Sequence, residues 1–119
     1  MKITELTKAE EQIMHILWDI ERGFVKDVIA KLPEPKPAYN TVSTILRILV
    51  DKEFVHFNAF GKTHQYYPLI KKEDYSNQQL NTIVSRFFDN SPKHLLSFLV
   101  KEDKLDINDL DEILKTLKK

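Results

Sequence analysis

A predicted helix over residues 39–52 places small polar side chains and one cation on a single face. These residues are three or four positions apart, which is the spacing of one helix face: Asn40, Ser43, Thr44 and Arg47. A solvated helix face normally carries Glu and Lys, and Ser, Thr and Asn are mediocre helix formers. Short hydrogen-bonding groups on such a face suit close approach to base edges in the major groove of DNA. An ordinary surface helix is the alternative interpretation.

The surroundings of this helix supply further groups that can reach DNA bases or phosphates. Arg47 best suits a guanine or a phosphate, and Asn40 suits an adenine or a phosphate. The opposite stripe of the helix is apolar and is expected to pack on a core; it consists of Val42, Ile45, Leu46 and Leu49. We predict DNA contacts from Lys36, Tyr39, Asn40, Thr41, Ser43, Thr44, Arg47, Lys52 and Lys62.

Net charge limits how such an interface can work. The chain of 119 residues has 18 Lys plus Arg and 18 Asp plus Glu, so its formal net charge is zero. Non-specific affinity for DNA scales with the cations that are presented to phosphates. We therefore expect weak non-specific binding, heavy reliance on specific contacts, and two copies of the chain acting together.

Two helices are predicted before residue 39. The pattern Thr7-x-x-Glu10 is a capping box that starts the first helix, which runs to about Glu21 with Gly23 as a natural stop. Residues 25–32 have the apolar spacing of a shorter second helix. Three prolines then prevent its continuation: Pro33, Pro35 and Pro37. The second helix, this connection and the helix over 39–52 together resemble a helix-turn-helix.

A β-hairpin is predicted after that helix. Residues 54–58 and 64–69 are rich in aromatic and β-branched types, and Gly61 between them suits a turn with positive φ. Two strands directly after a helix-turn-helix make a winged helix, with Lys62 and His64 near the tip of the wing. We therefore predict a mainly α fold with a small β-hairpin, in which residues 1–71 form a winged-helix DNA-binding domain.

Residues 72–119 are predicted to form a helical dimerisation domain. Ser91 with Pro92 signals the start of one helix, and Asp106 the start of another. Three short amphipathic helices have too little mass to bury their own apolar faces, so a second copy is expected to cover them. Packing back onto the winged helix is the alternative. The predicted dimer contacts are Leu80, Ile83, Val84, Phe87, Phe88, Leu95, Leu99, Leu110, Ile113, Leu114 and Leu117.

Several functional classes do not fit the composition. The chain has no cysteine and its four histidines lack metal-ligand spacing, so we expect no metal and no cofactor. No catalytic arrangement or phosphate-binding glycine loop is visible, and an enzyme is not expected. No apolar run is long enough to cross a membrane and no signal segment is seen, so a cytoplasmic protein is expected. The competing hypothesis is a winged-helix module that binds protein rather than DNA.

The ordered motifs resemble the penicillinase and methicillin-resistance repressors and the related copper-transport repressors. The resemblance covers nearly the whole chain. Residues 6–18 are similar to the family's opening helix, and residues 41–52 are similar to its recognition helix. Gly61-Lys62 and residues 66–69 resemble its wing. The resemblance implies a homodimeric winged-helix repressor that binds inverted-repeat operators.

The resemblance also implies release of the operator by proteolysis under the control of a membrane sensor. The equivalent bond joins Ser97 and Phe98, although relatives carry Asn in place of Ser97. The copper-responsive branch uses a cysteine cluster, which this chain lacks. Relatives often have Arg at the position of Ile48 and Gly at the position of Glu53. The operator sequence is therefore expected to differ from those of the relatives.

Overall fold

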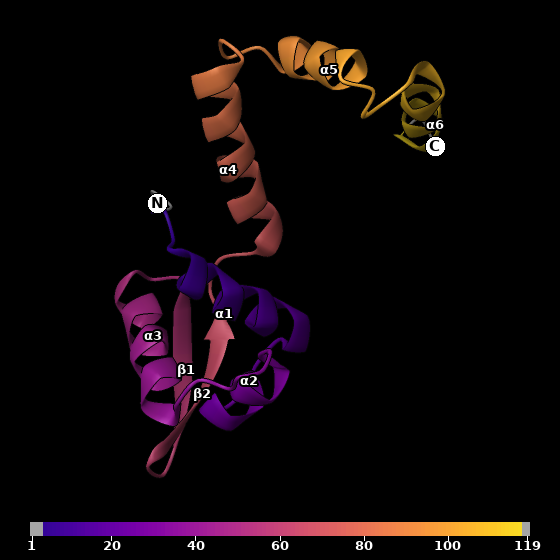
Figure 1. Cartoon of the computed structure of the whole chain (residues 1–119). Helices are drawn as coiled ribbons and strands as arrows, with labels where there is room; N and C mark the ends of the chain where they lie inside the picture. Colours follow the sequence, from indigo (N-terminus) through magenta and orange to yellow (C-terminus); the bar gives the residue numbers. More distant parts are fainter. Residues whose placement is uncertain (1–3, 118–119) are drawn as a thin grey trace. The chain divides into compact units, whose positions relative to one another are not determined.

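The computed structural model describes residues 4–117, which contain six helices and one antiparallel hairpin in the order α1, α2, α3, β1, β2, α4, α5, α6 (Figure 1). The chain is mainly α, as predicted. Contacts between residues divide it into two compact units, of which the first ends at Ser76 and the second begins at Asn77. The division falls inside α4 (Lys72–Phe87), whereas the sequence suggested a boundary between 71 and 72.

Helix α1 (Lys8–Ile20) begins at the predicted capping box. The backbone N–H of Glu10 donates to Thr7 Oγ1 at 3.2 Å, and the N–H of Thr7 donates to Glu10 Oε1 at 3.0 Å. These bonds satisfy two of the amide groups that a helix start leaves without partners. The helix ends at Ile20 with Glu21 as its C-cap, which agrees with the predicted end at about Glu21; the positive φ at this end, 72°, belongs to Glu21.

Gly23 has a different role, which is to join the first unit's sheet. Its N–H donates to Tyr66 O at 2.9 Å and its carbonyl accepts from Tyr66 N at 2.8 Å, forming an antiparallel bridge. A Cβ at this position would lie 2.7 Å from Ile20 Cδ1. Glycine therefore allows the chain between α1 and α2 to approach the hairpin closely.

Helices α2 (Val25–Lys31) and α3 (Tyr39–Asp51) are separated by the proline-rich connection. Helix α3 ends in a Schellman motif: Phe54 N donates to Leu49 O and Glu53 N donates to Val50 O, both at 3.0 Å. Glu53 has φ 65°, the left-handed conformation that this motif requires. The motif also brings the buried side chains of Leu49 and Phe54 into the core.

Strands β1 (Val55–Phe60) and β2 (Thr63–Pro68) pair from Val55↔Pro68 to Phe60↔Thr63. The predicted turn over 59–63 shortens to Gly61 and Lys62, because the strands stay paired up to their ends. Gly61 has φ 63°, as its turn role requires. The tip of this hairpin extends beyond the helices of the first unit (Figure 1).

A single apolar core unites the first unit. It gathers buried side chains from α1, α2, α3, the hairpin and the first turn of α4, including Met14, Leu17, Val28, Val42, Leu46, Leu49, Phe54, Val55 and Tyr75. Trp18 Nε1 donates to Ile70 O at 2.8 Å, and Tyr75 Oη donates to Glu11 Oε2 at 2.8 Å. Burial, followed by the hydrogen bond to Glu11 and its charge, raises the pKa of Tyr75 to about 12. The start of α4 (Lys72–Phe87) is thereby anchored in this unit.

The second unit contains the rest of α4 with α5 (Pro92–Lys101) and α6 (Ile107–Leu117). Both predicted caps are confirmed. Ser91 Oγ accepts from His94 N at 3.2 Å, and Asp106 Oδ1 accepts from Asp109 N at 2.8 Å. Among the described residues of α5 and α6, none is buried.

Candidate nucleic-acid interface

Helix α3 presents three different sides, and the predicted contact residues are distributed among them. Val42, Leu46 and Leu49 are buried against the core. Asn40 and Thr44 are exposed and lie four residues apart, so they form a polar stripe directed away from that core. These two side chains can reach base edges if α3 enters a major groove.

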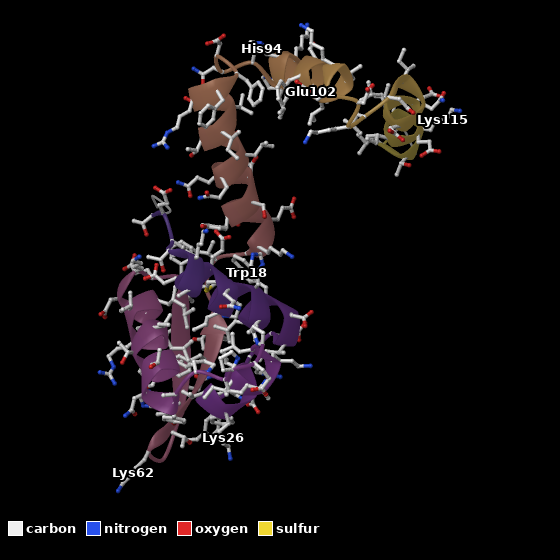
Figure 2. All side chains as sticks on the ribbon, viewed as in Figure 1. Trp18, Lys26, Lys62, His94, Glu102 and Lys115 are labelled. Carbon is white, nitrogen blue, oxygen red and sulfur yellow. The ribbon has the colours of Figure 1, made fainter. Side chains whose placement is uncertain are left out.

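A cleft of about 530 Å³ lies between α3 and the hairpin. Three predicted contact residues of α3, spaced four residues apart, line one wall: Tyr39, Ser43 and Arg47. Lys62, Thr63 and His64 line the other wall. The structure thus brings cations from α3 and from the hairpin tip to one cleft, and Figure 2 shows Lys62 extending from that tip.

The floor of this cleft is aromatic. The rings of Phe57 and His64 are stacked with centroids 4.1 Å apart and planes at 6°. Burial raises the pKa of Tyr66, while the positive charge of Arg47 acts in the opposite direction. Arg47 lines this cleft together with Lys62 and Tyr66, so its side chain lies on the side of α3 that faces the hairpin. Arg47 therefore suits a phosphate held between helix and wing.

Tyr66 was not among the predicted contact residues. Tyr66 lines the cleft beside His64, two residues earlier on the same strand face, but it is only 7% exposed and belongs to the core. Ile48 was also not predicted as a contact, although it is exposed on α3. Its position outside the apolar stripe of the helix is visible in the sequence.

Thr41 lies on the other flank of α3. With Ile45 it lines an apolar pocket of about 250 Å³, together with Ile13 of α1 and the three prolines of the connection. Thr41 and Asn40 are therefore directed differently, although they are adjacent in the sequence. The exposed Thr41 can still reach a phosphate at the edge of a groove.

Two predicted phosphate contacts are engaged within the chain. Lys52 Nζ lies 2.7 Å from Glu10 Oε1, and Glu10 is only 6% exposed. Lys36 Nζ donates to the carbonyls of Ala30 at 3.1 Å and Leu32 at 2.5 Å, which are acceptors at the end of α2. Both ammonium groups thus stabilise the winged helix itself.

The buried Glu10 carboxylate is kept charged by its partners. Burial raises its pKa, but the hydrogen bond from Lys52, the backbone hydrogen bond from Thr7 and the charge of Lys52 outweigh burial. The net effect is a pKa below the ordinary value of 4.5. This ion pair connects the start of α1 to the end of α3 and so helps to orient α3.

The predicted dimer contacts form a second surface. Phe87 is 72% exposed and Leu117 is 75% exposed. Val84 is the exception, at 7%. Exposed apolar side chains on this scale are typical of a surface that another chain covers. Other large exposed members of the set are Leu80, Ile83, Ile113 and Leu114, whereas Phe88, Leu95, Leu99 and Leu110 are half-buried.

Ser97 and Phe98 are both exposed within α5. The ring of Phe98 lies 5.4 Å from that of Phe88, in an edge-to-face arrangement. The peptide bond between Ser97 and Phe98 is therefore helical, and it must leave the helix before it can enter a protease active site.

Between residues 4 and 117, no helix is long and apolar enough to span a membrane. The same residues contain no group of three or more His, Cys, Asp and Glu side chains that could hold a metal ion.

Comparison with known proteins places this chain beside bacterial repressors. Residues 6–119 match the family model described as penicillinase repressor. The penicillinase repressor of Bacillus licheniformis is 25% identical over 118 residues, covering 96% of this chain and 92% of that protein. The methicillin resistance regulatory protein MecI of Staphylococcus aureus (strain N315) is 22% identical over 119 residues, covering 99% and 97%.

A solved structure is similar over part of the chain. It is the solution structure of monomeric Bacillus licheniformis BlaI in complex with the blaP half-operator. It shares 27% identity and a TM-score of 0.51, and the match covers 62% of this chain and 92% of the BlaI chain.

Proposed function

Because the chain belongs to the penicillinase repressor family, we propose that it represses transcription by binding operator DNA through α3 and the β1–β2 hairpin. Its relatives include a penicillinase repressor and a methicillin resistance regulatory protein, and the chain is accordingly a transcriptional regulator and not an enzyme. The observation that supports the proposed binding mode is the cleft in which Arg47 and Lys62 face each other beside the exposed stripe of α3. The BlaI structure with similar architecture holds a half-operator.

In the proposed complex, α3 lies in the major groove and the hairpin follows the adjacent backbone. An α-helix with its side chains is about 10–12 Å across, which matches a major groove about 12 Å wide. Asn40 and Thr44 then face base edges, while Arg47 and Lys62 approach a phosphate from two sides. Asp51 also lines the cleft and repels that phosphate, which limits the non-specific affinity.

The test is an electrophoretic mobility shift with the chain's own promoter region, at fixed and then at increasing salt. We expect sequence-specific retardation that weakens as salt is added. Arg47→Ala should lower operator affinity by about 1–3 kcal/mol. Arg22→Ala is the matched control, because Arg22 lies beside Asn58 and Tyr67 on the opposite face of the hairpin. Failure to select any specific fragment from genomic DNA would favour the protein-binding module instead.

We also propose that the repressor is a homodimer held by α4, α5 and α6. The support is the exposure of their apolar side chains, which leaves α5 and α6 without a buried residue in their described parts. A two-fold dimer would place two copies of α3 on the two halves of an inverted repeat. Size exclusion with light scattering should give twice the chain mass of 14.0 kDa. A persistent monomer at micromolar concentration would contradict the dimer.

Release of the operator is proposed to follow cleavage between Ser97 and Phe98, in a system controlled by a membrane sensor. The support is the family resemblance together with the exposure of both side chains on α5. Because the relatives include a penicillinase repressor and a methicillin resistance regulatory protein, the challenge chosen is a β-lactam. Challenged cells should accumulate a shortened chain on an immunoblot, and Phe98→Ala should block its appearance. Derepression with the chain still intact would rule out this mode of release.

A further inference from the structure

Ile48 is an apolar side chain on the exposed part of α3. It is 38% exposed, whereas the buried stripe of the same helix is at most 1% exposed. Ile45 and Val50, the half-buried aliphatic residues of α3, pack against the core cluster, but Ile48 does not belong to that cluster. The stability of the first unit therefore does not explain an isoleucine at this position.

Ile48 extends the stripe that we assign to base contacts. Asn40, Thr44 and Ile48 follow one another at four-residue intervals, with the cleft that contains Arg47 on one flank and the pocket that contains Thr41 on the other. Eight residues of helix span about 12 Å, which is the length of between three and four base pairs. A helix whose first turn reaches one end of a half-site can thus place Ile48 over a base further along.

The chemistry of the major groove indicates what this side chain would meet. The C5-methyl of thymine is the apolar group that a base pair presents there. Against a polar base edge, Ile48 would remove water without offering a hydrogen bond. Resting on the proposed function, we infer that Ile48 contacts the C5-methyl of one thymine in each operator half-site and makes that position specific for thymine.

Deoxyuridine tests this contact, because it differs from thymidine in lacking only that methyl group. Operator duplexes carry deoxyuridine at one thymine position at a time, in both half-sites, and affinity for the full chain is measured by fluorescence anisotropy. At one position the loss of the methyl should weaken binding about fourfold per half-site, or about 15-fold for the symmetric pair. The other thymine positions should change little.

The protein arm of the experiment uses Ile48→Ala. This variant should bind the thymine operator more weakly and should bind the thymine and deoxyuridine operators about equally at that position. Leu69→Ala removes a similarly exposed apolar side chain outside α3, and it should keep the wild-type ratio.

Two results would overturn the inference while leaving the repressor proposal intact. One is a specifically bound operator for which thymine and deoxyuridine are equivalent at every position. The other is an Ile48→Ala variant that keeps the full discrimination of the wild type. Absence of any specifically bound operator would instead overturn the proposed function, and this inference with it.

Discussion

Lys52 shows how a single contact decides between two roles for a cation. Its ammonium lies 2.7 Å from a carboxylate oxygen of Glu10, and the Lys52 and Glu10 side chains are 30% and 7% exposed. Leaving one member of a buried ion pair without its partner is costly, because the remaining charge is poorly hydrated. We therefore expect Lys52 to contribute more to the stability of the winged helix than to contacts with phosphate.

Substitution of Lys52 separates these roles. Lys52→Met should lower the free energy of unfolding by about 1–3 kcal/mol, because Glu10 keeps its charge without its partner. The slope of operator affinity against salt should stay the same. Lys62→Met should do the reverse, reducing that slope by about one without changing stability. Urea unfolding measures the stability, and salt titrations of operator binding measure the slope. A reduced slope for Lys52→Met would show that Lys52 contacts a phosphate after all.

The same ion pair predicts a dependence of stability on pH. The folded-state pKa of Glu10 lies below its ordinary value of 4.5, so the unfolded chain binds the proton more readily. The stabilisation is complete above about pH 4.5 and is lost as the pH falls through the folded-state value. Glu10→Gln should thus be less stable than wild type at pH 7 by about 1–2 kcal/mol. This difference should shrink on acidification, whereas a constant difference would contradict the assignment.

The contact that engages Lys52 could not be predicted from the local sequence. Lys52 and Glu10 are 42 residues apart, and their meeting depends on how α1 packs against α3. The polar stripe of α3 was visible in the sequence because its residues share one helix and its period. The orientation of Arg47 toward the wing again required the packing of α3 beside the hairpin.

The helix termini show which element boundaries local chemistry determines. Thr7, Ser91 and Asp106 were predicted as caps, and each accepts a backbone hydrogen bond from the residue three positions later. The first helix ends near the predicted Glu21, but the antiparallel bridge between Gly23 and Tyr66 was not predicted. Long-range pairing determined that feature, and it has no signal in the residues next to Gly23.

The end of α3 contains strain that a substitution can relieve. Glu53 has φ 65° within the Schellman motif, a conformation that costs a residue with a Cβ about 1 kcal/mol. Glu53→Gly removes that cost but gives the unfolded chain more freedom, so the gain should be at most about 1 kcal/mol. Glu53→Asn should also stabilise the folded chain, and it should increase the freedom of the unfolded chain less than glycine does. Thermal unfolding measures both, and Glu53→Ala is the control that removes the charge without relieving the strain.

In the proposed repressor, operator binding and dimerisation belong to different units of the chain. The first unit has a complete core and the cleft beside α3, whereas the described parts of α5 and α6 lack buried residues. A chain with a formal net charge of zero is expected to gain little non-specific affinity for DNA from one half-site. Joining two copies makes the second contact intramolecular, which raises the affinity without any new contact to DNA. Operator occupancy should therefore depend on the second unit.

Leu114→Asp tests that dependence, because it places a charge on an exposed apolar side chain of α6. If α6 lies in the dimer interface, the carboxylate loses hydration there and dimerisation weakens. The variant should elute as a monomer, bind the full operator at least about 100-fold more weakly, and show about half the salt slope. Its affinity for an isolated half-site should match that of the wild type. Thr116→Asp adds the same charge to an exposed polar position of α6 and should leave the dimer intact. A monomeric Leu114→Asp variant with undiminished operator affinity would show that one copy of the winged helix is enough.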